Sequence, residues 1–195
     1  MSFFILAFLS QSILDFSLVD GILTIGSSGK LTEGKIGSIF TIDLIKIVIF
    51  DTNGDTYLEN NAFFNYPNLM SCHLSSSVVY ISETAFRFCK SLSNITVESS
   101  NNYFVVQDQI LYNKAKQTII KVPVTATNVA IQDIVTTIKN HAFHFIKKMT
   151  SLFIPKTVMS IEPGAFYDSH IDLVEFQNDS ELKTLVSNSF SYTFI

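Results

Sequence analysis

The chain lacks several features that mark common classes of protein. Its 195 residues include no Trp and only two Cys. Two cysteines are too few for a disulfide framework or a structural zinc site. Charged residues make up only 15% of the chain, and the formal net charge is −4. Because the lysines are scattered rather than gathered into a basic stripe, the sequence disfavours nucleic-acid binding.

Long apolar runs are also absent. No run reaches the roughly 18 consecutive apolar residues of a membrane-spanning helix, so we expect no transmembrane span. The chain opens with MSFFILAFL, an apolar stretch of the length expected in a signal peptide. We interpret residues 1–12 as a signal peptide or, alternatively, as an apolar cap over the end of the core. The first interpretation predicts a secreted or cell-surface protein, and the second leaves a cytoplasmic protein open.

What the sequence does contain is a repeated dipeptide. The chain has eight Ala, and five of them are followed directly by Phe. Four of these pairs end at phenylalanines that are separated by 23, 57 and 23 residues, where 57 is one interval of 23 plus an insert of 34. Two degenerate copies, Ile39-Phe40 and Ser189-Phe190, extend the frame. The predicted column of stacked rings comprises Phe40, Phe63, Phe86, Phe143, Phe166 and Phe190.

A second apolar pattern keeps the same spacing. About six residues after each Phe comes a triplet spaced L-x-x-I-x-I, for example Leu92, Ile95 and Val97. Its last two positions alternate with polar or variable residues, as a strand with one buried face requires. A period near 23 residues is typical of a repeat solenoid, in which each turn buries its apolar side only against its neighbours. We therefore predict a β-rich solenoid of short strands joined by turns or short helical segments.

The residues of one frame support a family resemblance. Ile81 to Val97 reads Ile-x-x-x-Ala-Phe-x-x-Cys-x-x-Leu-x-x-Ile-x-Val, which resembles the leucine-rich repeat of BspA-like surface antigens. The resemblance implies a single leucine-rich-repeat array over residues 20–195, truncated at its C-terminus. Residues 98–128 resemble the wider variant turn of such arrays. The resemblance also implies a binding or adhesion module for proteins or glycans of a host or neighbouring cell.

The repeat predicts which side chains face solvent. In each strand, the residue between the last two apolar positions should point outward, with a second outward residue two positions earlier. Exposed Phe153 and Leu173 among polar neighbours are what a partner-binding surface shows, although ordinary surface variation is the alternative. The predicted surface comprises Val48, His73, Thr96, Phe153 and Glu175, and beside them Lys46, Ser71, Asn94, Ser151 and Leu173.

Two short sequence motifs suggest glycosylation. Asn94 and Asn178 each begin an N-glycosylation sequon. A chain this rich in Asn, Ser and Thr also yields such matches by chance, so both interpretations stay open. A glycan on Asn94 would cover part of the predicted binding surface.

The sequence offers no convincing catalytic or cofactor site. The segment from Gly26 to Lys30 lacks the spacer of a phosphate-binding loop and is interpreted as a turn. His141 and His144 could chelate a metal in principle, but no third ligand stands nearby in the frame, so we expect solvated histidines. Carboxylates such as Asp168 and Asp172 fall at expected solvent positions. We therefore predict a non-enzymatic protein without a cofactor; an intracellular scaffold for protein interactions is the alternative to an adhesion module.

Overall fold

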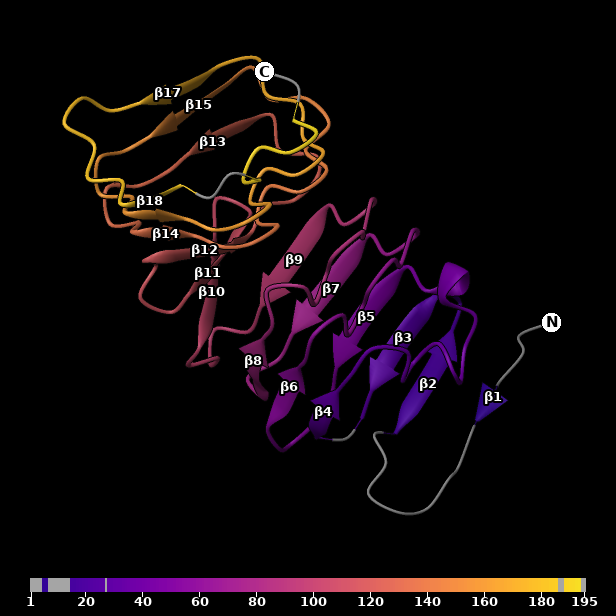
Figure 1. The fold of residues 1–195 in the computed structure, drawn as a ribbon. Coiled ribbons are helices and arrows are strands. Elements are labelled where there is room, and N and C mark those ends of the chain that lie inside the picture. The colour runs from indigo at the N-terminus through magenta and orange to yellow at the C-terminus, as the bar shows by residue number, and fades with distance from the viewer. Residues whose placement is uncertain (1–4, 7–14, 27, 186–187, 194–195) are drawn as a thin grey trace. The chain divides into compact units, whose positions relative to one another are not determined.

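The solenoid predicted from the repeat is what the fold shows. The computed structural model describes residues 5–6, 15–26, 28–185 and 188–193. The chain divides into two compact units, Met1–Phe104 and Val105–Ile195. In each unit, successive turns add strands to two separate ladders (Figure 1). The described residues contain no α-helix, and one 3-10 helix spans Ile42–Leu44. Apart from Ile5–Leu6, the residues 1–12 expected to form a leader or cap lie outside the described part of the chain.

The first unit contains a six-stranded and a three-stranded sheet. The larger sheet has the order β1-β2-β3-β5-β7-β9, and the smaller has the order β4-β6-β8. The first two pairs of the larger sheet are antiparallel and all later pairs are parallel, as stacked turns require. The strands are β1 (Ile5–Leu6), β2 (Phe16–Val19), β3 (Ile22–Ile25), β4 (Gly29–Leu31), β5 (Ile47–Phe50), β6 (Thr56–Leu58), β7 (Ser71–Leu74), β8 (Val78–Ile81) and β9 (Asn94–Val97).

A two-residue hairpin starts the regular part of the larger sheet. Val19 pairs with Ile22 across Asp20 and Gly21, whose φ angles are 51° and 83°. Two consecutive left-handed residues make the type of turn whose twist matches that of an antiparallel pair, and an Asp-Gly dipeptide is well suited to it. A side chain at Gly21 would also lie 3.0 Å from the carbonyl oxygen of Leu44. The glycine is therefore required by both the turn and its neighbour.

The second unit repeats the arrangement with a different opening. Its sheets have the orders β10-β11-β12-β14-β16-β18 and β13-β15-β17. Strands β11 and β12 are antiparallel and lie in the segment 98–128, which the sequence marks as irregular, and the later pairs are parallel. The strands are β10 (Phe104–Gln107), β11 (Ile110–Asn113), β12 (Thr118–Lys121), β13 (Asn128–Ala130), β14 (Thr137–Ile138), β15 (Ser151–Ile154), β16 (Ser160–Ile161), β17 (Val174–Phe176) and β18 (Thr184–Leu185).

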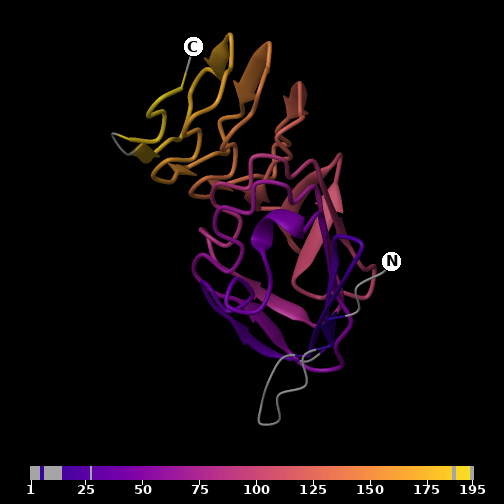
Figure 2. The ribbon, with the colours of Figure 1, turned by 90° about the vertical axis from the view of Figure 1, so that its right-hand side faces the viewer.

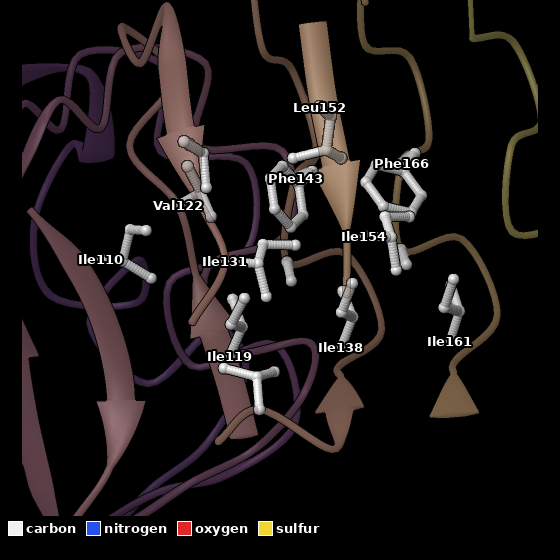
Figure 3. Packing of buried hydrophobic residues seen from close by; sticks show 14 of the residues in the cluster. Ile110, Ile119, Val122, Ile131, Ile138, Phe143, Leu152, Ile154, Ile161 and Phe166 are labelled. Atoms are coloured by element: carbon white, nitrogen blue, oxygen red, sulfur yellow. The ribbon is translucent and has the colours of Figure 1, made fainter. Parts of the chain in front are cut away.

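The phenylalanines form a column inside each unit. In the first unit, the rings of Phe63 and Phe86 lie 5.5 Å apart and almost parallel. In the second unit, Phe166 lies 4.8 Å from Phe143 and 4.5 Å from Phe190. Figure 3 shows Phe143 and Phe166 next to each other, with the apolar residues of β12, β14, β15 and β16 packed around them. Equivalent residues of successive turns therefore share one interior, as stacking demands.

Backbone hydrogen bonds join the turns at the same place. The N–H of three of these phenylalanines donates to the carbonyl of the residue before the next Phe, from Phe63 to Ala85, Phe143 to Ala165 and Phe166 to Ser189, each at 2.8 Å. The Ala side chains of these pairs are buried. A small residue at this position lets the two backbones approach to hydrogen-bonding distance. The Ala-Phe dipeptide thus marks the point where one turn is bonded to the next, and Figure 2 shows these turns overlying one another in the first unit.

Candidate binding surfaces

The exposed side of the β5-β7-β9 sheet presents two columns of side chains in the first unit. Cα pairing aligns Ile49 with His73 and Thr96, and Ile47 with Ser71 and Asn94. Three residues on β5 and β7 were predicted to face solvent. Ser71 and His73 lie in these columns, and Val48 does not. We call the six aligned residues the unit-1 face, and they are Ile47, Ile49, Ser71, His73, Asn94 and Thr96.

The structure corrects the predicted surface at β5. Val48 was predicted to face solvent, but it is 0% exposed and aligns with the buried Cys72. Lys46 is exposed, yet it precedes β5 and it is Ile47 that aligns with Ser71. The buried triplet of this turn is Ile45, Val48 and Phe50, one residue later than the pattern indicated. Because side chains alternate along a strand, a slip of one residue moves every side chain to the opposite face.

Hydrogen bonds between neighbouring strands fix the polar half of the unit-1 face. His73 Nδ1 and Thr96 Oγ1 are 2.7 Å apart, and Asn94 Nδ2 donates to Ser71 Oγ at 3.1 Å. Each bond joins a residue to its equivalent one turn later. The four side chains are therefore held in place before any partner arrives, and they still offer donors and acceptors to solvent.

A carboxylate closes one end of this polar array. Glu98 Oε1 lies 3.9 Å from His73 Nε2, and Glu98 Oε2 accepts a hydrogen bond from the backbone N–H of Ser76 at 2.7 Å. The Ser76 N–H favours the charged carboxylate, and with His73 it lowers the pKa of Glu98 below its usual value. At neutral pH this end of the surface therefore carries a negative charge.

The second unit has its own exposed sheet face. Strand pairing aligns Ala130, Phe153 and Glu175 in one column, and Asn128 pairs with Ser151 in the other. Phe153 and Leu173 are each 48% exposed, and Ser151 and Glu175 are also exposed. All four residues predicted for this unit therefore face solvent. An aromatic and an aliphatic side chain standing among polar ones form a small apolar contact area.

The two histidines of the second unit are not solvated, contrary to the prediction. His144 is 0% exposed and His141 is 9% exposed. The ring of His144 stacks on that of Phe145 at 3.9 Å and meets Tyr167 edge to face at 5.3 Å. Both histidines sit in the tight turn around Phe143, where side chains pack between successive turns. No group of three or more His, Cys, Asp or Glu residues suited to a metal occurs in the described part of the chain.

The remaining chemical candidates occupy structural or solvated positions. Cys72 and Cys89 are buried, and burial raises the pKa of the Cys72 thiol. Cys89 Sγ–H donates to the carbonyl oxygen of Phe63 at 3.0 Å, which links two turns. Asp168 and Asp172 are exposed, as are the sequon residues Asn94 and Asn178. Residues 29–30 of the glycine-rich segment belong to strand β4. The described residues contain no helix long and apolar enough to cross a membrane.

One exposed aromatic group was missed at the level of sequence. Tyr57, Tyr80 and Tyr103 follow one another at intervals of 23 residues, the period of the Ala-Phe pairs. Tyr80 and Tyr103 are 46% and 49% exposed. The 23-residue interval was the signal that could have identified these tyrosines. Outward positions tolerate any residue type, so the tyrosines belong to none of the repeated apolar patterns.

Comparison with known families agrees with this architecture. A model of the BspA type leucine-rich repeat region matches residues 40–129 and 124–195 in six copies. The chain belongs to the BspA-type leucine-rich-repeat family. The family resemblance read from residues 81–97 is thereby confirmed, and the BspA-type repeats extend through both units. No protein of curated function matches the chain.

Solved structures share the BspA-type fold at low sequence identity. A leucine-rich cell surface protein from Faecalibacterium prausnitzii superposes with a TM-score of 0.63 and 23% identity, covering 79% of this chain and 41% of that one. The pneumococcal vaccine antigen PcpA superposes with a TM-score of 0.57 and 15% identity, covering 83% of this chain and 48% of PcpA. The chain thus spans less than half the length of either protein, and at these identities the similarity concerns the fold.

Proposed function

We propose that this BspA-type protein is a non-catalytic binding or adhesion module that acts outside the cell or at its surface. Its partners are proteins or glycans of a host or neighbouring cell. The observation that carries the proposal is the unit-1 face, where polar side chains of successive turns are hydrogen-bonded in place on a parallel sheet. The exposed Phe153 and Leu173 provide a second contact area on the other unit.

Few side chains of the unit-1 face need to become ordered when a partner binds. Association costs free energy for each side chain that becomes immobilised, about 0.5–1.5 kcal/mol for a flexible one. His73 and Asn94 are already tied to residues of the adjacent strands. The half-exposed Ile47 and Ile49 lie beside them and supply apolar area. A rigid surface with both kinds of contact is suited to binding a macromolecule.

A binding assay with matched variants tests the proposal. Fluorescently labelled protein made without N-glycans is titrated onto intact cells of the producing organism and of the tissue it contacts. We expect saturable binding that falls at least about tenfold in Asn94→Arg and Thr96→Arg, because each adds a charge and a bulky side chain to the contact. Asn53→Arg, at an exposed position in the turn after β5, serves as the control and should bind normally. Equal binding by all three variants would contradict the assignment of this face.

Localisation needs a separate test. The apolar N-terminal segment supports export, and one solved structure with this fold is itself described as a cell surface protein. Protease added to intact cells should degrade the native protein, and its intact mass should show loss of the leader. The same mass shows whether Asn94 or Asn178 carries a glycan. A protein that is protected from protease and retains residues 1–12 would favour the intracellular scaffold instead.

A further inference from the structure

The three tyrosines at 57, 80 and 103 form an aromatic column on a different sheet from the unit-1 face. Tyr57 on β6 is the Cα partner of Tyr80 on the parallel neighbour β8, after a shift of the register between Thr56 and Tyr57. The residues flanking Tyr57 on its strand, Thr56 and Leu58, are buried, so Tyr57 points to the opposite, outer side. Tyr57 is half-buried and Tyr80 is 46% exposed. Two phenol rings of adjacent turns therefore share one solvent-facing surface.

Tyr103 continues the column by one more turn. Asn101 lies 23 residues after Val78, and its side-chain amide donates to the Val78 carbonyl at 3.0 Å. The same side chain accepts a hydrogen bond from the backbone N–H of Tyr103 at 2.8 Å. Asn101 thus attaches the Tyr103 segment beside β8 in the frame of the earlier turns. Tyr103 is 49% exposed and stands two residues after Asn101, as Tyr80 stands two residues after Val78.

The charged residue next to Tyr57 in the row forms an ion pair. Lys30 on β4 pairs in register with Tyr57 and so occupies the position before it in the row. Its Nζ forms an ion pair with Glu59 Oε1 at 3.3 Å. The charged residue aligned with Tyr57 is therefore already paired with a carboxylate.

We propose that the column of Tyr57, Tyr80 and Tyr103 binds a neutral polysaccharide. Sugar rings have apolar faces of C–H groups that stack on aromatic rings, while their hydroxyls hydrogen-bond with phenols and water. Rings repeated on adjacent parallel strands recur about every 4.8 Å. An extended polymer of sugar units, each of similar length, can therefore occupy successive tyrosines with successive units. The pairing of Lys30 with Glu59 beside the column favours a partner without charge.

This proposal does not depend on the unit-1 face. The tyrosines stand on and beside the sheet β4-β6-β8, whereas the unit-1 face belongs to the sheet that contains β5, β7 and β9. A protein partner could also use exposed tyrosines, but it would not require three of them at equal intervals. Loss of either activity by mutation should therefore leave the other unchanged.

Affinity electrophoresis and tyrosine fluorescence test the proposal on the intact chain. The protein is run through native gels that contain a soluble β-glucan, an α-glucan, a mannan or a xylan, and through a gel with an anionic polysaccharide. Because the chain has no Trp, the emission of its seven tyrosines reports directly on stacking. We expect at least one neutral polymer to retard the protein and to change this emission. Tyr80→Ala and Tyr103→Ala should each weaken that binding about tenfold.

Conservative and remote variants separate stacking from loss of fold. Tyr80→Phe keeps the ring and should retain most of the affinity. Tyr192→Ala removes an exposed tyrosine of the second unit and should bind as the unaltered protein does. Thermal unfolding checks that the alanine variants remain folded. Absence of retardation by every neutral polymer, retardation only by the anionic one, or normal binding by both alanine variants would overturn the proposal, as would binding only to a protein ligand.

Discussion

A single backbone conformation recurs two residues after five of the six phenylalanines of the column, Phe40 being the exception. The residues at this position are left-handed in five turns, with φ of 57° at Asn65, 63° at Phe88, 64° at Phe145, 52° at Asp168 and 57° at Tyr192. Asn and Asp tolerate this region, whereas aromatic residues enter it at a cost of about 1–2 kcal/mol. These positions therefore share a backbone conformation rather than a residue type. Packing stabilises the aromatic residues there, as in the stacking of Phe145 on His144.

Substitutions at Asp168 should measure this backbone requirement directly. The side chain is exposed, so its replacement changes few contacts. We expect Asp168→Val to lower the free energy of unfolding by about 1–2 kcal/mol because a β-branched residue fits poorly at positive φ. Asp168→Gly should remain within about 0.5 kcal/mol of the original. Urea unfolding of both proteins checks the pair, and equal stability of the valine and glycine variants would contradict the strain argument.

At the start of the second unit, the buried Lys121 donates hydrogen bonds of the kind that a neighbouring turn provides elsewhere in the stack. In later turns, the carbonyl of the residue after each Phe accepts a backbone N–H from the preceding turn, as Tyr167 does from Phe145. For His144, the corresponding carbonyl accepts Lys121 Nζ at 3.3 Å, and the same Nζ donates to the His141 carbonyl at 3.2 Å. The ammonium thus supplies a donor to the His144 carbonyl and a second donor to the His141 carbonyl, which also accepts the backbone N–H of His144 at 3.2 Å.

Removing that ammonium should destabilise the stack. Lys121→Met keeps the length of the side chain but removes the ammonium hydrogen bonds to the buried carbonyls of His141 and His144. Loss of the partner of a buried polar group costs about 1–3 kcal/mol, so unfolding in urea should occur at a lower concentration. Lys148→Met, at an exposed position, is the control and should unfold at the original concentration. A Lys121→Met protein of unchanged stability would show that water replaces the ammonium without loss.

At the scale of the elements, the position of a ring in the column should decide its contribution. Phe166 is fully buried between Phe143 and Phe190, whereas Phe190 is half-buried and has one ring neighbour among the described residues. Phe166→Ala should cost about 3–5 kcal/mol, the range for a large cavity in a well-packed core. Phe190→Ala should cost clearly less. Calorimetric or urea unfolding of the two variants distinguishes this order from a column in which all rings contribute equally.

The individual strands show how much of the structure could be predicted from the sequence. The Phe frame follows directly from the 23-residue period. The strands β7, β9 and β15 follow from the alternation of buried and exposed residues, since polar residues such as His73 and Thr96 mark the exposed face. Strand β5 reads Ile-Val-Ile-Phe, in which every residue is apolar, so alternation gives no direction. The prediction then chose the wrong face for Val48. The burial of His141 and His144 was missed because it depends on packing between turns rather than on the residue type.

At the scale of the whole molecule, the chain is modular in units of one turn. The bonds that join turns connect residues about 23 positions apart, such as Phe143 to Ala165 and Phe145 to Tyr167. Stability in such a stack is approximately a sum of turns and of interfaces between adjacent turns. A complete turn can therefore be removed without a change in the type of contact made by the remaining ones.

A frame-preserving deletion tests this modularity. Removing residues 144–166 joins Phe143 to Tyr167. Asp168, which is already left-handed, then takes the place of Phe145. Phe143 should come to lie against Phe190, in the position that Phe166 has now. Strand β13 should then pair with β17, and β14 with β18, in their present registers. We expect a cooperative thermal transition at a lower temperature, because one interface between turns is lost. Removing residues 144–155 instead aligns strand residues of one turn with loop residues of the next, and no cooperative transition of the second unit should remain. Similar unfolding of the two deletion proteins, followed by circular dichroism, would mean that the stack does not depend on the 23-residue frame.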